Sequence, residues 1–441
     1  MSTKTVQTSP SRSKFAVRML KYFSWAIAAP FVGIAAYLVV EMGFAQWTVS
    51  REVRLIREKG EPLTAQDLNA AYQPDSTRPD MTQDIMAALA LIKGLDGESE
   101  RKRFGTILNS EKLQVSPEPW YADSSFETVN AFATEHEPIL AVFSSLAREN
   151  GTARLPIDLS KGLEADFEAL KNIRLALTFM QVKARLFIFQ GKNTDAIAII
   201  RSITATARLI GEIPSAHGVL NSIAWYGSSE RLATAMVRDC DLSDTDLREL
   251  GEAVNGPDCR NLLHRALISD RAVNYSEMCN KSAFPTDSAK WLDEMRRRID
   301  AAENAIFPAT TEDARFRVEH RPFGYIRMSF LCPFTNYLLG SQEAVINAMA
   351  ECEARRAITE SVLSVERFRR KYGTAPDSLN ELVPEFVANR PVDPFTGEPM
   401  ITKRTAQEFL IYSVGRNRRD DGGDVGGDLP KDIVCKIRIE K

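Results

Sequence analysis

The sequence has few of the residues and spacings by which enzymes are recognised. Only four histidines occur in 441 residues, and none has the HExxH or HxH spacing of a metal site. The chain also has no GxSxG elbow, no GxxxxGKS/T phosphate loop and no GxGxxG after a strand-like segment. No motif therefore names a reaction or favours an enzyme over a binding or structural protein.

Closely spaced cysteine pairs are absent as well. The six cysteines contain no CxxC pair, which argues against a zinc ribbon or a thioredoxin-type site. Their even number allows disulfides if the chain is exported, although the spacing does not show the connectivity. The alternative is that they are free thiols buried in helices. The cysteines are Cys240, Cys259, Cys279, Cys332, Cys352 and Cys435.

A surplus of basic residues is also lacking. The formal net charge is -3, so no overall positive charge attracts a nucleic acid, and we expect no nucleic-acid partner. The share of hydrophobic residues, 44%, is ordinary for globular protein, and the length allows two or three domains.

The clearest feature present is an uncharged apolar segment at residues 22–40. As a helix it spans about 28 Å, close to the thickness of the hydrocarbon core of a bilayer. Tyr22 and Trp25 lie at one end and Trp47 beyond the other, as in the aromatic belts of membrane interfaces. We therefore expect a transmembrane anchor. A cleaved signal peptide and a buried helix are the alternatives.

Charges on the two sides of this segment predict its orientation. No acidic residue precedes Glu41, whereas the charges after the segment are mixed. The positive-inside rule then predicts a cytoplasmic N-terminus and export of the chain after about residue 45. The basic residues before the segment are Lys4, Arg12, Lys14, Arg18 and Lys21.

Residues 163–190 and 195–211 read as two antiparallel helices joined by a GKNT turn. Small residues would let the helices approach closely, and a glycine would end the first one. With small residues and a turn glycine placed in this way, the helix pair resembles one tetratricopeptide unit. An irregular helical domain is the alternative. The residues that carry the resemblance are Ala184, Gly191, Ala196 and Ile200.

The C-terminal part combines a long helix, three short strand-like segments and the loop YSVGRNRRDDGGDVGGDLPKD at residues 412–432. Calcium takes six to eight oxygen ligands on a flexible backbone, and alternating aspartate and glycine meet that need. Two alternatives remain open: an arginine–aspartate network, or a solvated loop. The arginines concerned are Arg416, Arg418 and Arg419.

The order of motifs in this part resembles the globular domain of the type II secretion major pseudopilins. The motifs are RFRRKYGTAPDSLNELVP, DPFTGEPM, FLIYSVG and DDGGD, over about the last quarter of the chain. The whole chain resembles uncharacterised membrane-anchored bacterial proteins of planctomycete type. A prepilin cleavage site before the apolar segment is missing, so we do not expect a processed, polymerising pseudopilin.

The pseudopilin resemblance implies an acidic calcium loop. Its first ligand position falls on Asn417, and its later ones fall near Asp424 and Asp428. Asp421 and Asp432 lie nearby as substitutes. The expected ligand set is therefore Asn417, Asp421, Asp424 and Asp428, with calcium as a structural cofactor.

These observations predict a mainly α protein with a small α+β C-terminal module. We expect a cytoplasmic basic tail at residues 1–21, an anchor at 22–46, an exported helical body at 47–337 and the C-terminal module at 338–441. The expected protein is a non-enzymatic, single-pass protein of the bacterial inner membrane with a periplasmic body. It would scaffold an unknown protein partner, and an envelope hydrolase is the alternative.

Overall fold

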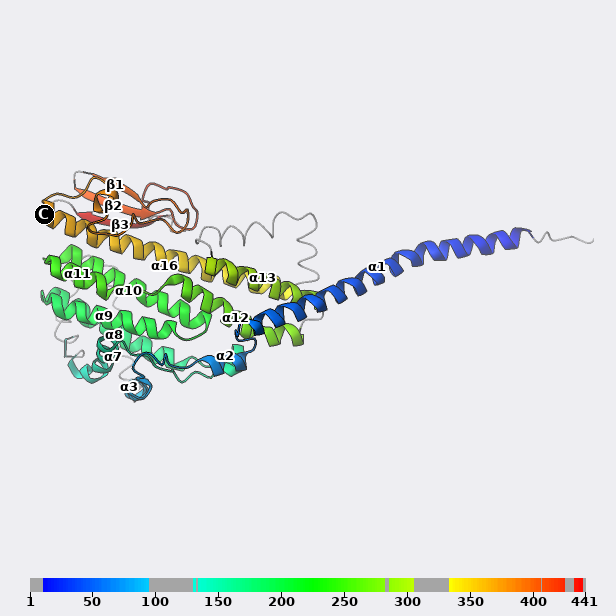
Figure 1. Ribbon diagram of the computed structural model, residues 1–441, viewed down its shortest axis with the longest axis horizontal. Coiled ribbons are helices and arrows are strands. Elements are labelled where there is room, and N and C mark those ends of the chain that lie inside the picture. Colours follow the sequence, from blue (N-terminus) through cyan, green and yellow to red (C-terminus); the bar gives the residue numbers. More distant parts are fainter. Residues whose placement is uncertain are drawn as a thin grey trace, which may run out of the picture.

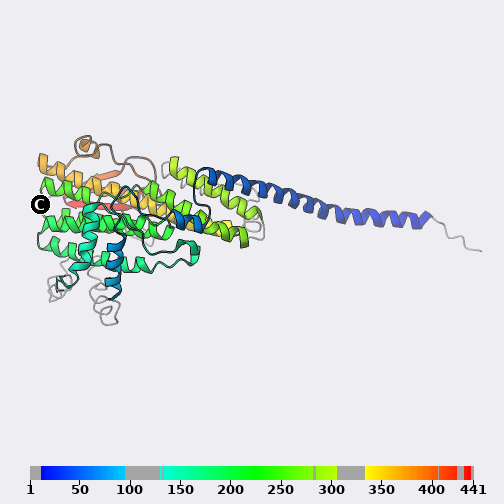
Figure 2. The same cartoon turned by 60° about the horizontal axis from the view of Figure 1, so that its bottom comes forward.

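The structure is a computed structural model that describes residues 11–94, 130–131, 134–281, 285–304, 333–405, 407–424 and 432–438. It is mainly helical, with one three-stranded sheet near the C-terminus. Figures 1 and 2 show an elongated bundle from which one long helix projects. The C-terminus lies at the end of the bundle opposite to that helix.

The projecting helix is α1 (Ser11–Glu58), which contains the predicted anchor. It is long and apolar enough to cross a membrane, and its apolar window is not buried against the body. At 1.5 Å per residue the helix is about 70 Å long, more than twice the thickness of a hydrocarbon core of about 30 Å. The helix therefore runs past the predicted end of the anchor at residue 46 and enters the body. It stops before Gly60, whose φ of 69° favours glycine.

Three short elements follow α1 and begin the body: α2 (Ala65–Ala71), α3 (Thr82–Gly94) and, after the undescribed stretch, α7 (Glu137–Glu149). The Thr64 hydroxyl accepts a hydrogen bond from the Asp67 amide at 3.2 Å and caps α2. The Asp67 carboxylate accepts in return from the Thr64 amide at 3.0 Å, which completes a capping box at the start of the helix. A 3-10 turn, η1 (Leu159–Glu164), leads into the next helices.

The centre of the body is a layer of antiparallel helices. These helices are α8 (Glu168–Phe189), α9 (Asn193–Gly211), α10 (Ala216–Asp239) and α11 (Asp244–Ala253). Helix α9 contacts α7, α8, α10 and α11, and Ala184 and Ala196 are fully buried between α8 and α9. The predicted helix pair is confirmed, and its membership of the tetratricopeptide class stays a prediction.

Helix α16 (Pro333–Tyr372) joins the body to the sheet. It contacts α10, α11, α12 (Cys259–Lys281) and α13 (Pro285–Asn304), and it also contacts β2 and β3. The expected division at residues 337 and 338 falls inside this helix. The helix therefore packs against both the helical body and the sheet of the C-terminal module.

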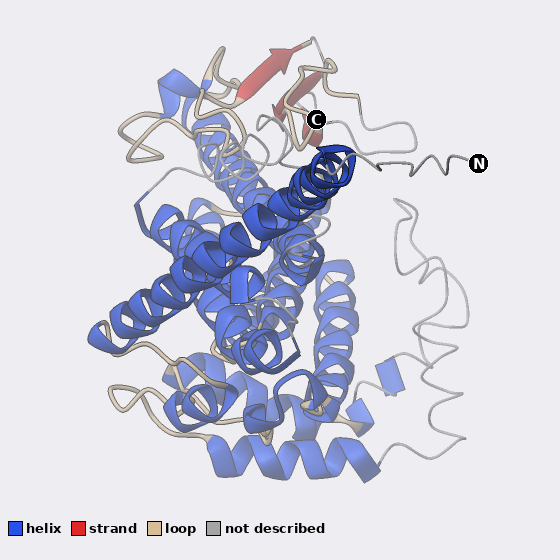
Figure 3. Cartoon of the chain, turned by 90° about the vertical axis from the view of Figure 1, so that its right-hand side faces the viewer, coloured by secondary structure: helices blue, strands red, loops and turns tan. Residues whose placement is uncertain are grey.

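The sheet has the antiparallel order β1 (Ile401–Arg404), β2 (Glu408–Ser413) and β3 (Ile433–Arg438). It lies against one side of the helical body (Figure 3). Phe409 and Ile411 on β2 are fully buried, so one face of the sheet supplies core. The predicted strands, and the α+β arrangement of the C-terminal module, are confirmed.

Candidate functional site

The turn before β1 is organised by one buried carboxylate. Asp393 is 1% exposed and accepts hydrogen bonds from the Phe395 amide at 2.8 Å, the Val414 amide at 2.9 Å and the Ser413 hydroxyl at 3.0 Å. Burying a charge is costly unless hydrogen bonds replace its water. Asp393 therefore joins the DPFTGEPM turn to the end of β2, where the aspartate loop begins.

The first half of the aspartate loop folds back over β2. The Tyr412 hydroxyl donates to Asp420 Oδ1 at 2.9 Å, and the Gly422 amide donates to the same oxygen at 2.8 Å. These hydrogen bonds, that from Gly422 first, lower the pKa of Asp420. Gly422 and Gly423 have φ values of 85° and 81°, which other residues adopt at a cost. The carboxylate is therefore part of the turn itself.

Asp432 closes the loop from the other side. Its carboxylate is 3% exposed and accepts from the Gly423 amide at 2.7 Å and the Asp421 amide at 3.5 Å. The sequence indicated Asp432 only as a substitute ligand, because its spacing does not show that it lies under the glycine turn. Both of its oxygens are engaged by the backbone, which gives it a structural role in the loop.

The structure brings together part of the expected calcium ligand set. Asn417 Nδ2 donates to Asp421 Oδ2 at 2.6 Å, and Asn417 Oδ1 accepts from the Arg419 amide at 3.0 Å. The carbonyl of Asp424 accepts from the Asp432 amide at 3.4 Å, and Asp428 lies outside the described residues. Asn417 thus turns its amino group, and not an oxygen, toward Asp421.

The donor chemistry of this loop fits calcium only in part. Within the described ranges, no three His, Cys, Asp or Glu side chains are grouped so that they could hold a metal ion. The carboxylate of Asp421 and the carbonyl oxygens of the loop are of the class that calcium prefers. Asn417 could join them only after its side-chain amide rotates.

The arginine–aspartate alternative fails for Arg416. This side chain pairs with Glu351 on α16 and not with an aspartate of the loop. Glu351 Oε2 also lies 3.9 Å from Arg355 Nη1, and Arg355 Nε lies 3.7 Å from Glu230 Oε2 on α10. A chain of four alternating charges therefore connects the loop to the interior of the helical body.

Glu230 at the inner end of this chain is buried. Burial raises its pKa to about 7, although the positive charge of Arg355 acts in the opposite direction. The other charged groups that act on it are Arg231, Arg356 and Glu353.

We expect stability to fall as the pH rises, because of Glu230. Its pKa is near 4.5 when unfolded and about 7 when folded, so the folded state holds the proton more tightly. The stabilising contribution is complete below pH 4.5 and is lost as the pH rises through about 7. The wild-type chain should lose up to about 3 kcal/mol over this window relative to Glu230→Gln. Urea denaturation of both proteins at several pH values measures the difference, and parallel pH profiles would contradict it.

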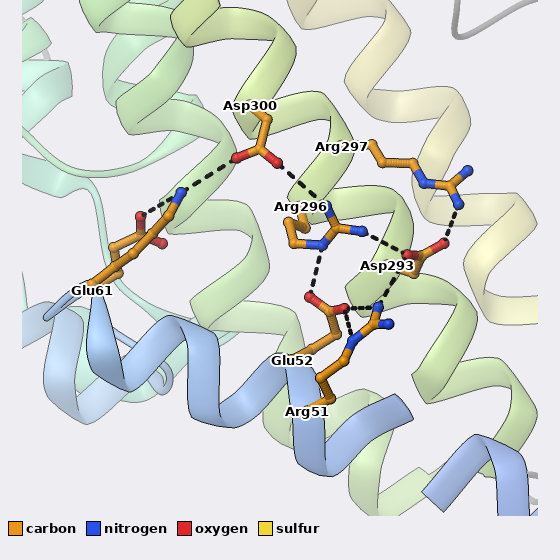
Figure 4. Close-up of polar contacts among 8 residues, drawn as sticks. Arg51, Glu52, Glu61, Asp293, Arg296, Arg297 and Asp300 are labelled. Atoms are coloured by element: carbon orange, nitrogen blue, oxygen red, sulfur yellow. Dashed lines mark hydrogen bonds and ion pairs between the residues drawn. The ribbon is translucent and has the colours of Figure 1, made fainter. Parts of the chain in front are cut away.

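A second charged cluster joins α1 to the body (Figure 4). Glu52 on α1 is 1% exposed and lies between two arginines. Arg51 Nε donates to Glu52 Oε1 at 3.1 Å, and Arg296 Nε on α13 donates to Glu52 Oε2 at 3.0 Å. Removing a carboxylate that is paired in this way leaves two cations facing each other.

The cluster extends along both helices. Arg296 also binds Asp293 at 2.9 Å and Asp300 at 3.4 Å, and Lys59 lies 3.3 Å from Asp300. At the end of α1, Glu61 pairs with Arg271 of α12 at 2.8 Å. The projecting helix and the residues directly after it are thus held to both α12 and α13 by ion pairs.

Whole-sequence comparisons match no protein-family model, no curated protein and no solved structure. The functional argument accordingly rests on the contacts of this chain's own residues. Sequence patterns indicated the aspartate loop but missed the anchor cluster. The charged run in residues 288–306 is the signal that could have drawn attention to it, since runs of both signs often form networks.

Proposed function

We propose that this chain is a single-pass membrane protein whose helical body and C-terminal module scaffold a protein partner on the exported side. The observation that carries the proposal is the continuity of α1. One helix runs from the apolar segment into a buried ionic cluster of the body. The body is therefore held in a defined orientation on its anchor, and a flexible tether is not involved.

The position of the C-terminal module supports this role. The sheet packs on α16 at the end of the bundle that lies away from α1 (Figure 1). A rigid bundle between the anchor and the module would hold the module at a fixed distance from the membrane. Such an arrangement suits a protein that presents a binding surface to a partner.

The buried carboxylates support a scaffold more than a hydrolase. Glu52 and Glu230 face arginines, while Asp393 and Asp432 accept hydrogen bonds from the backbone. Each of these groups has a role in holding two elements together. The hydrolase alternative would need carboxylates that converge on a substrate site.

The orientation can be tested with reporters. The basic residues before the apolar segment favour a cytoplasmic N-terminus. We therefore expect a reporter that matures only outside the cytoplasm to be active when fused after Lys441 and inactive when fused after Lys21. A Lys441 fusion that is inactive with this reporter, but active with a reporter that matures only in the cytoplasm, would overturn the proposal.

We further propose that the C-terminal module is pseudopilin-like and gains stability from calcium. The motif order and the Asp393 turn support the first point, and the oxygen donors of the aspartate loop support the second. Asp421 and Asp424 would hold the ion together with loop carbonyl groups, and Asn417 would join them after rotation of its amide. The role of the ion would be to neutralise and order the loop.

Calcium should then stabilise the full chain. We expect millimolar calcium to raise the free energy of unfolding by about 1–2 kcal/mol, because only the folded loop gathers its ligands. Thermal melting of the chain in detergent micelles, followed by a signal from the sheet, measures the change. Asp421→Asn with Asp424→Asn should abolish it, whereas Asp377→Asn, at an exposed position of the same module, should not. An unchanged melting temperature in the wild type would remove calcium from the proposal.

A further inference from the structure

Two of the six cysteines lie together in the interior, although 92 residues separate them in sequence. Cys259 is the first residue of α12, and Cys352 lies on α16. Each is only 2% exposed, and both belong to the same hydrophobic core. Helices α12 and α16 contact each other directly.

The loop that leads into α12 also lies against side chains of α10 and α16. A Cβ built on Gly256 would lie 3.9 Å from Arg356 Cδ and 3.4 Å from Tyr226 Cδ1. Gly256 lies in the loop three residues before Cys259, and Arg356 follows Cys352 by one turn of α16. The chain entering α12 therefore runs along the turn of α16 that carries Cys352.

Both thiols are free in this structure, and the Cys352 side chain lies within hydrogen-bonding reach of Cys259. A hydrogen bond with the Cys352 side chain, and burial, raise the pKa of Cys259 well above its usual range. Glu353 acts in the same direction and Arg356 in the opposite one. Buried thiols of this kind react slowly with outside reagents, which favours their oxidation before the helices have fully closed.

We propose that Cys259 and Cys352 form a disulfide that joins α12 to α16 in the mature protein. The pairing of these two residues rests on their burial and contact. Formation of the disulfide in the cell rests on the export proposed above, because disulfides persist in oxidising compartments.

The reaction needs a disulfide as oxidant, such as glutathione disulfide or an oxidoreductase of the envelope. One thiol loses its proton and attacks the oxidant, and a thiolate leaves and takes up a proton. The second thiol then loses its proton and attacks the mixed disulfide. A sulfur–sulfur bond forms between Cys259 and Cys352, two electrons pass to the oxidant, and its two sulfurs leave as thiols.

The bond would close a loop that contains α12 and α13 and the undescribed segment before α16. Helix α13 carries Arg296, which holds the anchor helix, and α16 carries the sheet. A covalent link between α12 and α16 would thus connect the anchor side of the bundle to the C-terminal module. Closing a loop of this length restricts the unfolded chain strongly.

The full chain, refolded in detergent micelles with glutathione disulfide, tests the pairing. Free thiols are blocked with iodoacetamide under denaturing conditions, and unreduced peptides are analysed by mass spectrometry. We expect a peptide pair linked through Cys259 and Cys352, and a melting temperature at least about 5 °C above that of the reduced protein.

Alanine variants distinguish the effect of the disulfide on the melting temperature from the effect of losing a buried side chain. Cys259→Ala and Cys352→Ala should each melt at the same temperature with and without oxidant. Cys240→Ala, which removes another buried thiol, should keep the full difference in melting temperature between the oxidised and the reduced protein. Alkylation of both Cys259 and Cys352 in the oxidised wild type would overturn the proposal. If the disulfide forms in the purified chain but both cysteines are free thiols in cells, the result would contradict the proposed export. It would still support the pairing of Cys259 with Cys352.

Discussion

Glu52→Gln is expected to lower the free energy of unfolding of the full chain by about 2 kcal/mol. The substitution keeps the shape of the side chain but leaves Arg51 and Arg296 facing each other without the carboxylate between them. Breaking a fully buried pair costs about 3–5 kcal/mol, and the two arginines here are about one third exposed, which reduces the cost. Urea denaturation in detergent micelles measures the loss.

Glu58→Gln is the matched control for this experiment. Glu58 lies on the same helix, is 63% exposed and is 3.9 Å from Arg54. Its replacement should change stability by less than about 0.5 kcal/mol. Equal effects of the two substitutions would show that the cluster does not hold α1 to the body. The proposal that α1 holds the body in a defined orientation would then also be wrong.

Asp393→Asn is expected to destabilise the C-terminal module by about 3 kcal/mol. The carboxylate accepts from two backbone amides and one hydroxyl, and an asparagine would turn an amino group toward at least one of these donors. The site is fully buried, so water cannot satisfy the donors that are left. Hydrogen exchange of the β2 and β3 amides, which reports on local opening, measures the loss.

Asp377→Asn provides the comparison for Asp393. Asp377 belongs to the same module and pairs with Arg404, but its side chain is 85% exposed. Its replacement should leave the exchange of the strand amides nearly unchanged. Fast exchange in both variants, or in neither, would contradict a special role for Asp393.

Local patterns predicted most elements of this fold. The apolar run at residues 22–40 predicted the projecting helix, and residues 163–190 and 195–211 were read as the helix pair that α8 and α9 form. The strands were read from short apolar segments between turns. These signals are local because a helix cap, a glycine stop and a hydrophobic run act within a few residues of chain.

The candidate sites were predicted less completely, because their contacts join distant residues. Asn417 and Asp421 are neighbours on the chain and do meet, as expected. Asp432 reaches the glycine turn from β3, and Arg416 finds Glu351 on α16 instead of an aspartate of its own loop. Spacing within the loop carries no information about either partner.

The sequence by itself determined the apolar segment, the basic residues before it, the helix pair at residues 163–211 and the three short strands of the C-terminal module. Each of these follows from local hydropathy, charge or backbone preference. Only the tertiary structure decided that Glu52 meets Arg296, that Glu230 lies at the inner end of a charge chain, and that Cys259 meets Cys352. Those pairs depend on how helices far apart in the chain pack, which local hydropathy, charge and backbone preference do not determine.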